Sequence, residues 1–179
     1  MHPRTQELLT YLDAQRAVLR TTLESAPAAI RERVPGPGAW SVANVLEHLA
    51  IVEQRIATLL ASMIEKARAD GLAAETSSEP LLPTLGVERL ANRETKVVAP
   101  DLLHPTGITA AAAWTALEQA GVALRDAVRT GDGLALGTLS RTHPLFGPLS
   151  LYQWIAFVGA HEARHAAQIE EIAASLQPR

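Results

Sequence analysis

A short stretch near the end of the chain carries two histidines four residues apart. Residues 157–172 read FVGAHEARHAAQIEEI, which places Glu162 between His161 and His165. On a helix such histidines are neighbours on one face, where two imidazoles can bind one divalent ion. The alternative is a pair of core histidines that are hydrogen-bonded to backbone or water. The H-E-x-x-H spacing also occurs in zinc proteases, where the glutamate is the general base.

The protease interpretation lacks its sequence context. The extended form of the motif requires a glycine and a third histidine downstream, but Gln168 and Glu171 stand at those positions. No strand-rich substrate domain is indicated either, so we do not expect a protease. Glu162 could still assist catalysis beside the histidines. The alternative is a Glu162 that is solvated or paired with Arg164.

A third histidine, His48, lies in another predicted helix, at the edge of an apolar stripe that includes Val45 and Val52. A lone histidine at such a position is usually a satisfied core residue, but bundles assemble metal sites from facing helices. Three histidine ligands would leave a coordination position for water or substrate. The chain has no cysteine, so histidines and carboxylates must hold any metal, and imidazoles suit zinc, nickel, copper or iron alike.

The last helix has a polar middle within its apolar stripe, formed by His161, Glu162, His165 and Gln168. Burying such groups without partners costs roughly a few kcal/mol each. A bound metal is one way to satisfy them.

Four long helices are expected to position these residues. Apolar residues three and four apart predict helices over 4–24, 41–70, 109–130 and 150–176. Ser41 is a plausible cap of the second helix, and Ser150 with Gln153 forms a capping box for the fourth. With no convincing strand, the fold class is all-α, a four-helix bundle with long connecting loops.

The connection over 72–108 contains four prolines, which exclude a long helix. We expect a short helix over 87–93 and an extended piece over 96–103. A second loop covers 131–149 and contains His143, which precedes a proline. A His–Pro pair is typical of a turn, although His143 is close enough in sequence to the last helix to overhang the site.

Composition and charge bound the class of protein. The 179 residues are 47% hydrophobic and 20% charged, which indicates a single globular domain over 1–179. A net charge of −3 and the lack of a Lys/Arg cluster argue against nucleic acid. No apolar run is long enough to span a membrane, and the polar N-terminus does not resemble a signal peptide, so we expect a cytoplasmic location.

Two motifs together resemble the DinB-like superfamily. They are WSVANVLEHLA (40–50), with W-S-x-x-x-x-x-x-H, and HPLFGPLSLYQWIAFVGAHEARHAAQI (143–169), with H-x-x-x-H and a trailing glutamine. Their order and spacing match over 4–176. The resemblance implies an up-down-down-up four-helix bundle with a divalent metal, zinc or nickel, bound by His48, His161 and His165. It also implies a homodimer that acts on a small molecule, because relatives include thiol S-transferases and metal-dependent hydrolases.

A common mechanism would serve both activities. A divalent ion lowers the pKa of a bound water or thiol, which supplies a nucleophile near neutral pH. Our hypothesis is that the metal activates a low-molecular-weight thiol cosubstrate for attack on a small electrophile. Gln168, one turn after His165, and Asn44, one turn before His48, are expected to orient the ligand imidazoles. For Asn44 the alternative is an ordinary polar residue of a first helical turn.

Two non-catalytic functions are also open. In one, the metal only satisfies a polar core, with Glu162 as a fourth ligand, and its removal destabilises the protein. In the other, the protein is a stress-response module that binds a thiol or small molecule without turnover.

Overall fold

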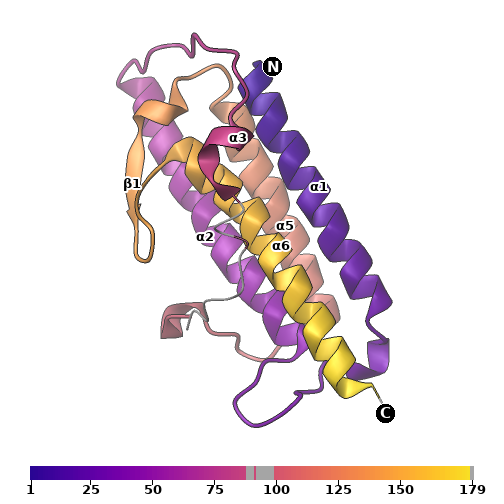
Figure 1. Cartoon of the computed structure of the whole chain (residues 1–179). Helices are drawn as coiled ribbons and strands as arrows, with labels where there is room; N and C mark the ends of the chain where they lie inside the picture. Colours follow the sequence, from indigo (N-terminus) through magenta and orange to yellow (C-terminus); the bar gives the residue numbers. More distant parts are fainter. Residues whose placement is uncertain (88–90, 92–98, 178–179) are drawn as a thin grey trace.

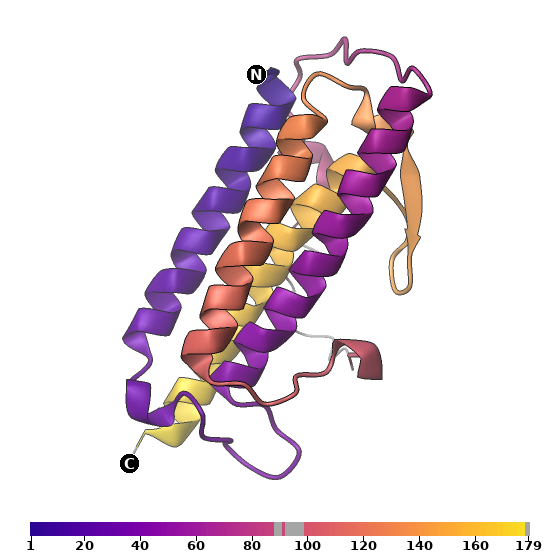
Figure 2. The same ribbon diagram turned by 180° about the vertical axis from the view of Figure 1, so that it is seen from behind.

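The computed structural model describes residues 1–87, 91 and 99–177. Four long helices lie side by side in an elongated bundle (Figures 1 and 2): α1 (Pro3–Ser25), α2 (Val42–Ala69), α5 (Ala110–Thr130) and α6 (Leu151–Leu176). α1 and α6 run in one direction, and α2 and α5 run in the other. This up-down-down-up order confirms the predicted bundle, and each predicted helix differs from the observed one by no more than a residue at either end.

Both predicted helix caps are present. The Ser41 hydroxyl accepts a hydrogen bond from Asn44 N, and the Asn44 side chain accepts one from Ser41 N. Ser150 and Gln153 make the same reciprocal pair at the start of α6. Each pair satisfies backbone donors that a helix leaves without partners at its first turn.

The expectation of no strands is wrong, because a small antiparallel hairpin precedes α6. It consists of β1 (Ser140–His143) and β2 (Gly147–Ser150), with Ser140 opposite Ser150 and His143 opposite Gly147. Gly147 has φ of 73°, a backbone conformation that favours glycine. The hairpin lies outside α2 and α6, and its turn reaches the level of the middle of the bundle (Figures 1 and 2).

Short helical pieces occupy the connections. Those that lie within the described residues are η1 (Ala28–Ile30), α3 (Leu82–Leu85), η2 (Asp101–Leu103) and η3 (Leu136–Thr138). The short helix predicted over 87–93 falls mainly on residues outside those described. Residues 96–98 of the predicted extended piece over 96–103 also lie outside those described, and the piece is wrong at its end, where η2 forms a 3-10 turn after Pro100. None of the described helices combines the length and apolarity needed to cross a membrane.

The apolar core falls into two clusters along the bundle. One contains Leu60 and Ile155, and the other contains Leu46 and Ile169. Along α6, the residues that belong to neither cluster include Glu162 and His165, which are both buried. The predicted polar middle of this helix therefore lies inside the bundle, between two apolar ends that exclude water.

Candidate metal centre

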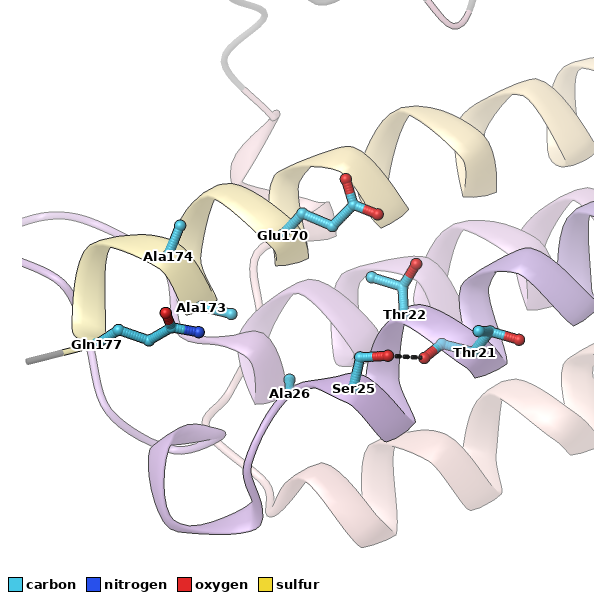
Figure 3. Close-up of a pocket in the computed structure, with 8 residues that line it drawn as sticks. All are labelled: Thr21, Thr22, Ser25, Ala26, Glu170, Ala173, Ala174 and Gln177. Carbon is cyan, nitrogen blue, oxygen red and sulfur yellow. Dashed lines mark hydrogen bonds between the residues drawn. The ribbon is translucent and has the colours of Figure 1, made fainter.

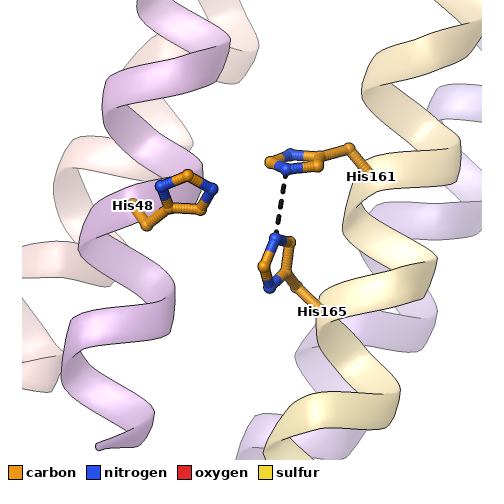
Figure 4. Close-up of side chains that lie close together, drawn as sticks. All are labelled: His48, His161 and His165. Atoms are coloured by element: carbon orange, nitrogen blue, oxygen red, sulfur yellow. Dashed lines mark hydrogen bonds between the residues drawn. The ribbon is translucent and has the colours of Figure 1, made fainter. Parts of the chain in front are cut away.

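Three histidines from two helices meet at the middle of the bundle. Figure 4 shows His48 on α2 facing His161 and His165 on α6. Each ring offers one nitrogen, and these three nitrogens all lie within 4.8 Å of one another. His48 and His165 are buried, and His161 is partly buried. The structure thus brings together the three residues that the sequence predicts as metal ligands.

Hydrogen bonds on the outer side of two rings fix their tautomers. Nδ1 of His165 lies 2.7 Å from Oε1 of Gln168, and Nδ1 of His48 lies 2.9 Å from the carbonyl oxygen of Leu103. Both oxygens are acceptors, so each Nδ1 carries the proton and donates. Nε2 of each neutral ring therefore keeps a lone pair.

The distance between the two α6 histidines fits a shared ion. Nε2 of His161 lies 3.1 Å from Nε2 of His165. Two nitrogens bound at about 2.0–2.1 Å to one tetrahedral ion lie roughly 3.3 Å apart. A lone pair of His165 aimed at another imidazole nitrogen needs either a proton or a cation between them. The donor set therefore fits a divalent ion that prefers imidazole ligands.

The surroundings favour the neutral form of the His48 and His161 rings. Burial lowers the pKa of His48, and it lowers the pKa of His161 further, to well below its usual value, with repulsion from His165 and His48 adding to the effect. A neutral imidazole is the form that binds a metal.

The segment before α5 is held against the site by Glu47. Its carboxylate accepts hydrogen bonds from the backbone N–H groups of Thr106, Gly107 and Ile108 and from the Thr106 hydroxyl. Burial alone would raise the pKa of Glu47, but these hydrogen bonds lower it. This clamp follows η2 closely in the chain, and η2 supplies the Leu103 carbonyl that orients His48.

The two predicted supporting residues lie in different surroundings. Gln168 contacts His165 directly, as a residue that orients a ligand must. Asn44 instead caps α2 through Ser41, and no hydrogen bond among the described residues joins its side chain to His48. Asn44 therefore has the surroundings of the alternative interpretation, a polar residue of the first turn.

Glu162, the predicted catalytic residue, is part of a buried ion network. Its Oε1 accepts from Nη2 of Arg16 at 2.7 Å and from Nε at 3.1 Å. Nη2 of Arg16 also donates to Oε2 of Glu53 at 2.6 Å. Glu162 is only 2% exposed, so it is not a solvated side chain. Its partner on α1 lies 146 residues earlier in the chain.

One proton satisfies the rest of this network. Oε1 of Glu53 and Oε2 of Glu162 have no hydrogen-bond partner among the described atoms. Burial raises the pKa of Glu53 to about 8, repulsion from Glu162 adds to the shift, and Arg16 opposes it. A protonated Glu53 donates to Glu162 and still accepts from Arg16.

The sequence reasoning missed Arg16 and the Leu103 carbonyl. Arg16 was detectable, because it stands between Leu12 and Leu19 in the apolar stripe of the first helix, where an arginine needs a buried partner. The Leu103 carbonyl had no sequence signal, since any residue type supplies a backbone oxygen.

Two surface hollows lie apart from the histidines. One, of about 270 Å³, lies between the C-terminal ends of α1 and α6 (Figure 3), lined by Thr21, Thr22, Ser25, Ala26, Glu170, Ala173, Ala174 and Gln177. The other lies on α2 beside Gln54 and Thr58. Neither includes a histidine, so we assign no chemistry to them.

Comparison with known proteins identifies a family and two proteins that are similar to this chain. The family model described as the DinB superfamily matches residues 11–169. "Uncharacterized protein YuaE" of Bacillus subtilis (strain 168) is 27% identical over 150 residues, which cover 80% of this chain and 83% of that protein. The crystal structure of TT2238, a four-helix bundle protein, superposes with a TM-score of 0.58 at 23% identity and covers 93% of this chain and 98% of that one. The likeness to TT2238 supports the fold alone.

Proposed function

The chain belongs to the DinB superfamily, and from that premise we propose that His48, His161 and His165 bind one divalent metal ion. The observation that carries the proposal is the 3.1 Å approach of two Nε2 atoms, one of which has its lone pair fixed by Gln168. Zinc or nickel suits three imidazole ligands. With three protein ligands, a fourth position is left for a substrate.

The activity that this site supports best is transfer of a low-molecular-weight thiol to a small electrophile. A divalent ion held by three histidines lowers the pKa of a bound thiol or water and supplies a nucleophile near neutral pH. The chain has no cysteine, so the thiol must arrive as a cosubstrate. Hydrolysis would use the same site with water in place of the thiol.

The chain's own residues orient the ligands. Gln168 and the Leu103 carbonyl hold the His165 and His48 rings with Nε2 facing inward. For Glu162 we propose orientation of α6 through Arg16, because its Oε1 already accepts two hydrogen bonds from that guanidinium.

A second candidate is a metal that only stabilises the bundle. It is favoured by the place of the histidines between the two apolar clusters, where a bound ion would join α2 to α6. A ligand-binding module without turnover belongs to the same class, and both predict metal binding without consumption of thiol.

We also propose that the protein is a cytoplasmic homodimer that acts on small molecules and not on nucleic acid. The family resemblance supports the dimer, and the net charge of −3 supports the exclusion of nucleic acid. Light scattering of the purified protein measures the dimer directly.

Elemental analysis after gel filtration tests the metal proposal. We expect about one divalent ion per chain in the wild type and loss of it in His48→Ala. His2→Asn is the matched control, because it removes a histidine outside the cluster and keeps a residue that caps α1. A wild type that holds no metal after reconstitution with zinc or nickel would contradict the proposal. Thiol consumption against a panel of electrophiles then separates transfer from binding without turnover.

A further inference from the structure

Aromatic rings form a continuous path from the histidine cluster to the hairpin. The Phe157 ring stacks on His161, with centroids 5.2 Å apart and planes at 20°. Phe157 also lies 5.0 Å from the ring of His143 in β1. Phe146, in the hairpin turn, lies 4.7 Å from His143 and 6.0 Å from Phe157. The hairpin thus extends an apolar aromatic wall from a candidate metal ligand to the surface.

The outer end of this wall is exposed. Phe146 is 41% exposed and its neighbour Leu145 is 59% exposed, although both are large apolar side chains. Apolar groups gathered at the surface beside a polar site are typical of ligand-binding surfaces. A turn that only connects two strands does not require an aromatic side chain, so Phe146 is not explained by the turn itself.

His143 adds a hydrogen-bond donor to the wall. Its Nδ1 accepts a hydrogen bond from the backbone N–H of Leu145 at 3.1 Å. The proton of the neutral ring is therefore on Nε2, and no described residue accepts a hydrogen bond from it. The ring is held in place, because Trp154 lies 5.0 Å from it and Trp154 Nε1 donates to the carbonyl of Arg141 on the same strand.

We propose that His143, Phe146 and Phe157 form a subsite, beside the three histidines, for an aromatic ring that carries a carbonyl group. The ring would pack against Phe146, and Nε2 of His143 would donate to the carbonyl oxygen. Phe157 is only 7% exposed, so it would support the Phe146 and His143 rings from inside the bundle. The inference rests on the proposed function only for the fate of the ligand. If a nucleophile forms at the histidine cluster, this subsite selects aromatic carbonyl compounds as the electrophile.

Three small probes separate the parts of this proposal. Acetophenone has both ring and carbonyl, ethylbenzene lacks the carbonyl, and 2-butanone lacks the ring. Each is titrated into the full chain while the imidazole ¹H–¹⁵N signals of His143 are followed by NMR. We expect acetophenone to shift these signals most and to bind roughly two- to tenfold more tightly than ethylbenzene, the gain that one hydrogen bond gives. Equal affinity for acetophenone and ethylbenzene would overturn the donor role.

Matched variants test the two kinds of contact. His143→Phe keeps a ring and removes the donor, so acetophenone should bind no better than ethylbenzene. Phe146→Ala should weaken both aromatic probes several-fold, whereas Val122→Ala, a truncation of an exposed apolar residue on α5, should leave them unchanged. Unchanged acetophenone binding in both His143→Phe and Phe146→Ala would overturn the subsite.

The probes need neither thiol nor turnover, so the test is independent of the proposed function. Metal content is measured on the same samples. A probe preference for acetophenone in protein that binds no metal would support the subsite and contradict the metal proposal. Metal binding without any preference for acetophenone would support the metal proposal and contradict the subsite.

Discussion

The orientation of single imidazole rings decides what the histidine cluster can bind. His165 and His48 each donate from Nδ1 to a fixed oxygen, so the nitrogens that carry lone pairs are set before any ion arrives. Ligand rings oriented in this way bind more tightly, because no conformational freedom is lost on binding.

Gln168→Ala tests whether the orientation of the His165 ring strengthens metal binding. We expect zinc affinity, measured by isothermal titration calorimetry, to fall about 10- to 100-fold, because His165 loses the acceptor that fixes its tautomer. Gln54→Ala, the same substitution on an exposed part of α2, is the control and should leave affinity unchanged. An unchanged affinity in Gln168→Ala would remove Gln168 from the site.

The raised pKa of Glu53 predicts that the stability of the fold falls as pH rises. In the unfolded chain Glu53 releases this proton near its ordinary pKa of 4.5, but the folded protein retains it up to a pKa of about 8. The stabilisation is therefore complete below the unfolded pKa and is lost as pH rises through about 8. The lowered pKa values of His48 and His161 act in the opposite direction, but only below about pH 6.5.

Glu53→Gln should abolish this slope. The amide donates to Glu162 and accepts from Arg16, as the protonated acid does, but it cannot ionise. Urea unfolding between about pH 6.5 and about pH 8 should show a falling free energy of unfolding in the wild type and a flat one in the variant. Glu118→Gln, at an exposed ion pair with Arg20, should keep the wild-type slope. Parallel slopes in wild type and Glu53→Gln would contradict the shared proton.

Among the elements, the α1–α6 pair depends on a close approach at one glycine. A Cβ added to Gly159 would lie 3.0 Å from Cδ1 of the Tyr11 ring and nearer still to Cε1. Real Cβ atoms do not approach ring carbons so closely, so the Tyr11 ring or one of the two helices would have to shift.

Gly159→Ala should therefore destabilise the protein by about 1–3 kcal/mol. This outcome is informative because alanine is the better helix former by roughly 1 kcal/mol, which predicts the opposite sign. Thermal unfolding measures the difference, and Gly36→Ala, where a Cβ meets nothing within 4 Å, serves as control. A more stable Gly159→Ala would mean that the Tyr11 ring moves aside without cost.

The elements differ in how far sequence alone could predict them. The four helices were predicted because their signals are local: apolar spacing, caps and proline breaks. The hairpin was missed because its strands have four residues each, β2 contains Pro148, and β1 is largely exposed. Such strands show no apolar alternation.

The candidate site shows the same division. His48, His161 and His165 were predicted because spacing places each on an inner helical face. The partner of Glu162 was not predicted, because Arg16 lies on another helix and no local rule pairs residues 146 positions apart. The Leu103 carbonyl depends on the path of 101–108, a segment with no repeating pattern.

At the scale of the whole molecule, polar residues occupy the middle of the bundle and apolar clusters occupy both ends. The clusters around Leu60 and Leu46 provide stability, while the middle holds the three histidines and the Arg16 network. This division allows the middle to carry polar groups whose burial would otherwise be unfavourable.

A metal in that middle would join α2 to α6, so binding should stabilise the entire fold. A ligand that binds only the folded state raises the free energy of unfolding by about 4 kcal/mol at 1,000 times its dissociation constant. Zinc should therefore raise the thermal midpoint of the wild type and of His2→Asn, and a chelator should reverse the increase. His48→Ala should show no increase, because the remaining two ligands lie on α6 alone and cannot connect it to α2. An equal increase in His48→Ala would mean that the ion binds α6 without crossing the bundle, and the three-histidine site would then be wrong.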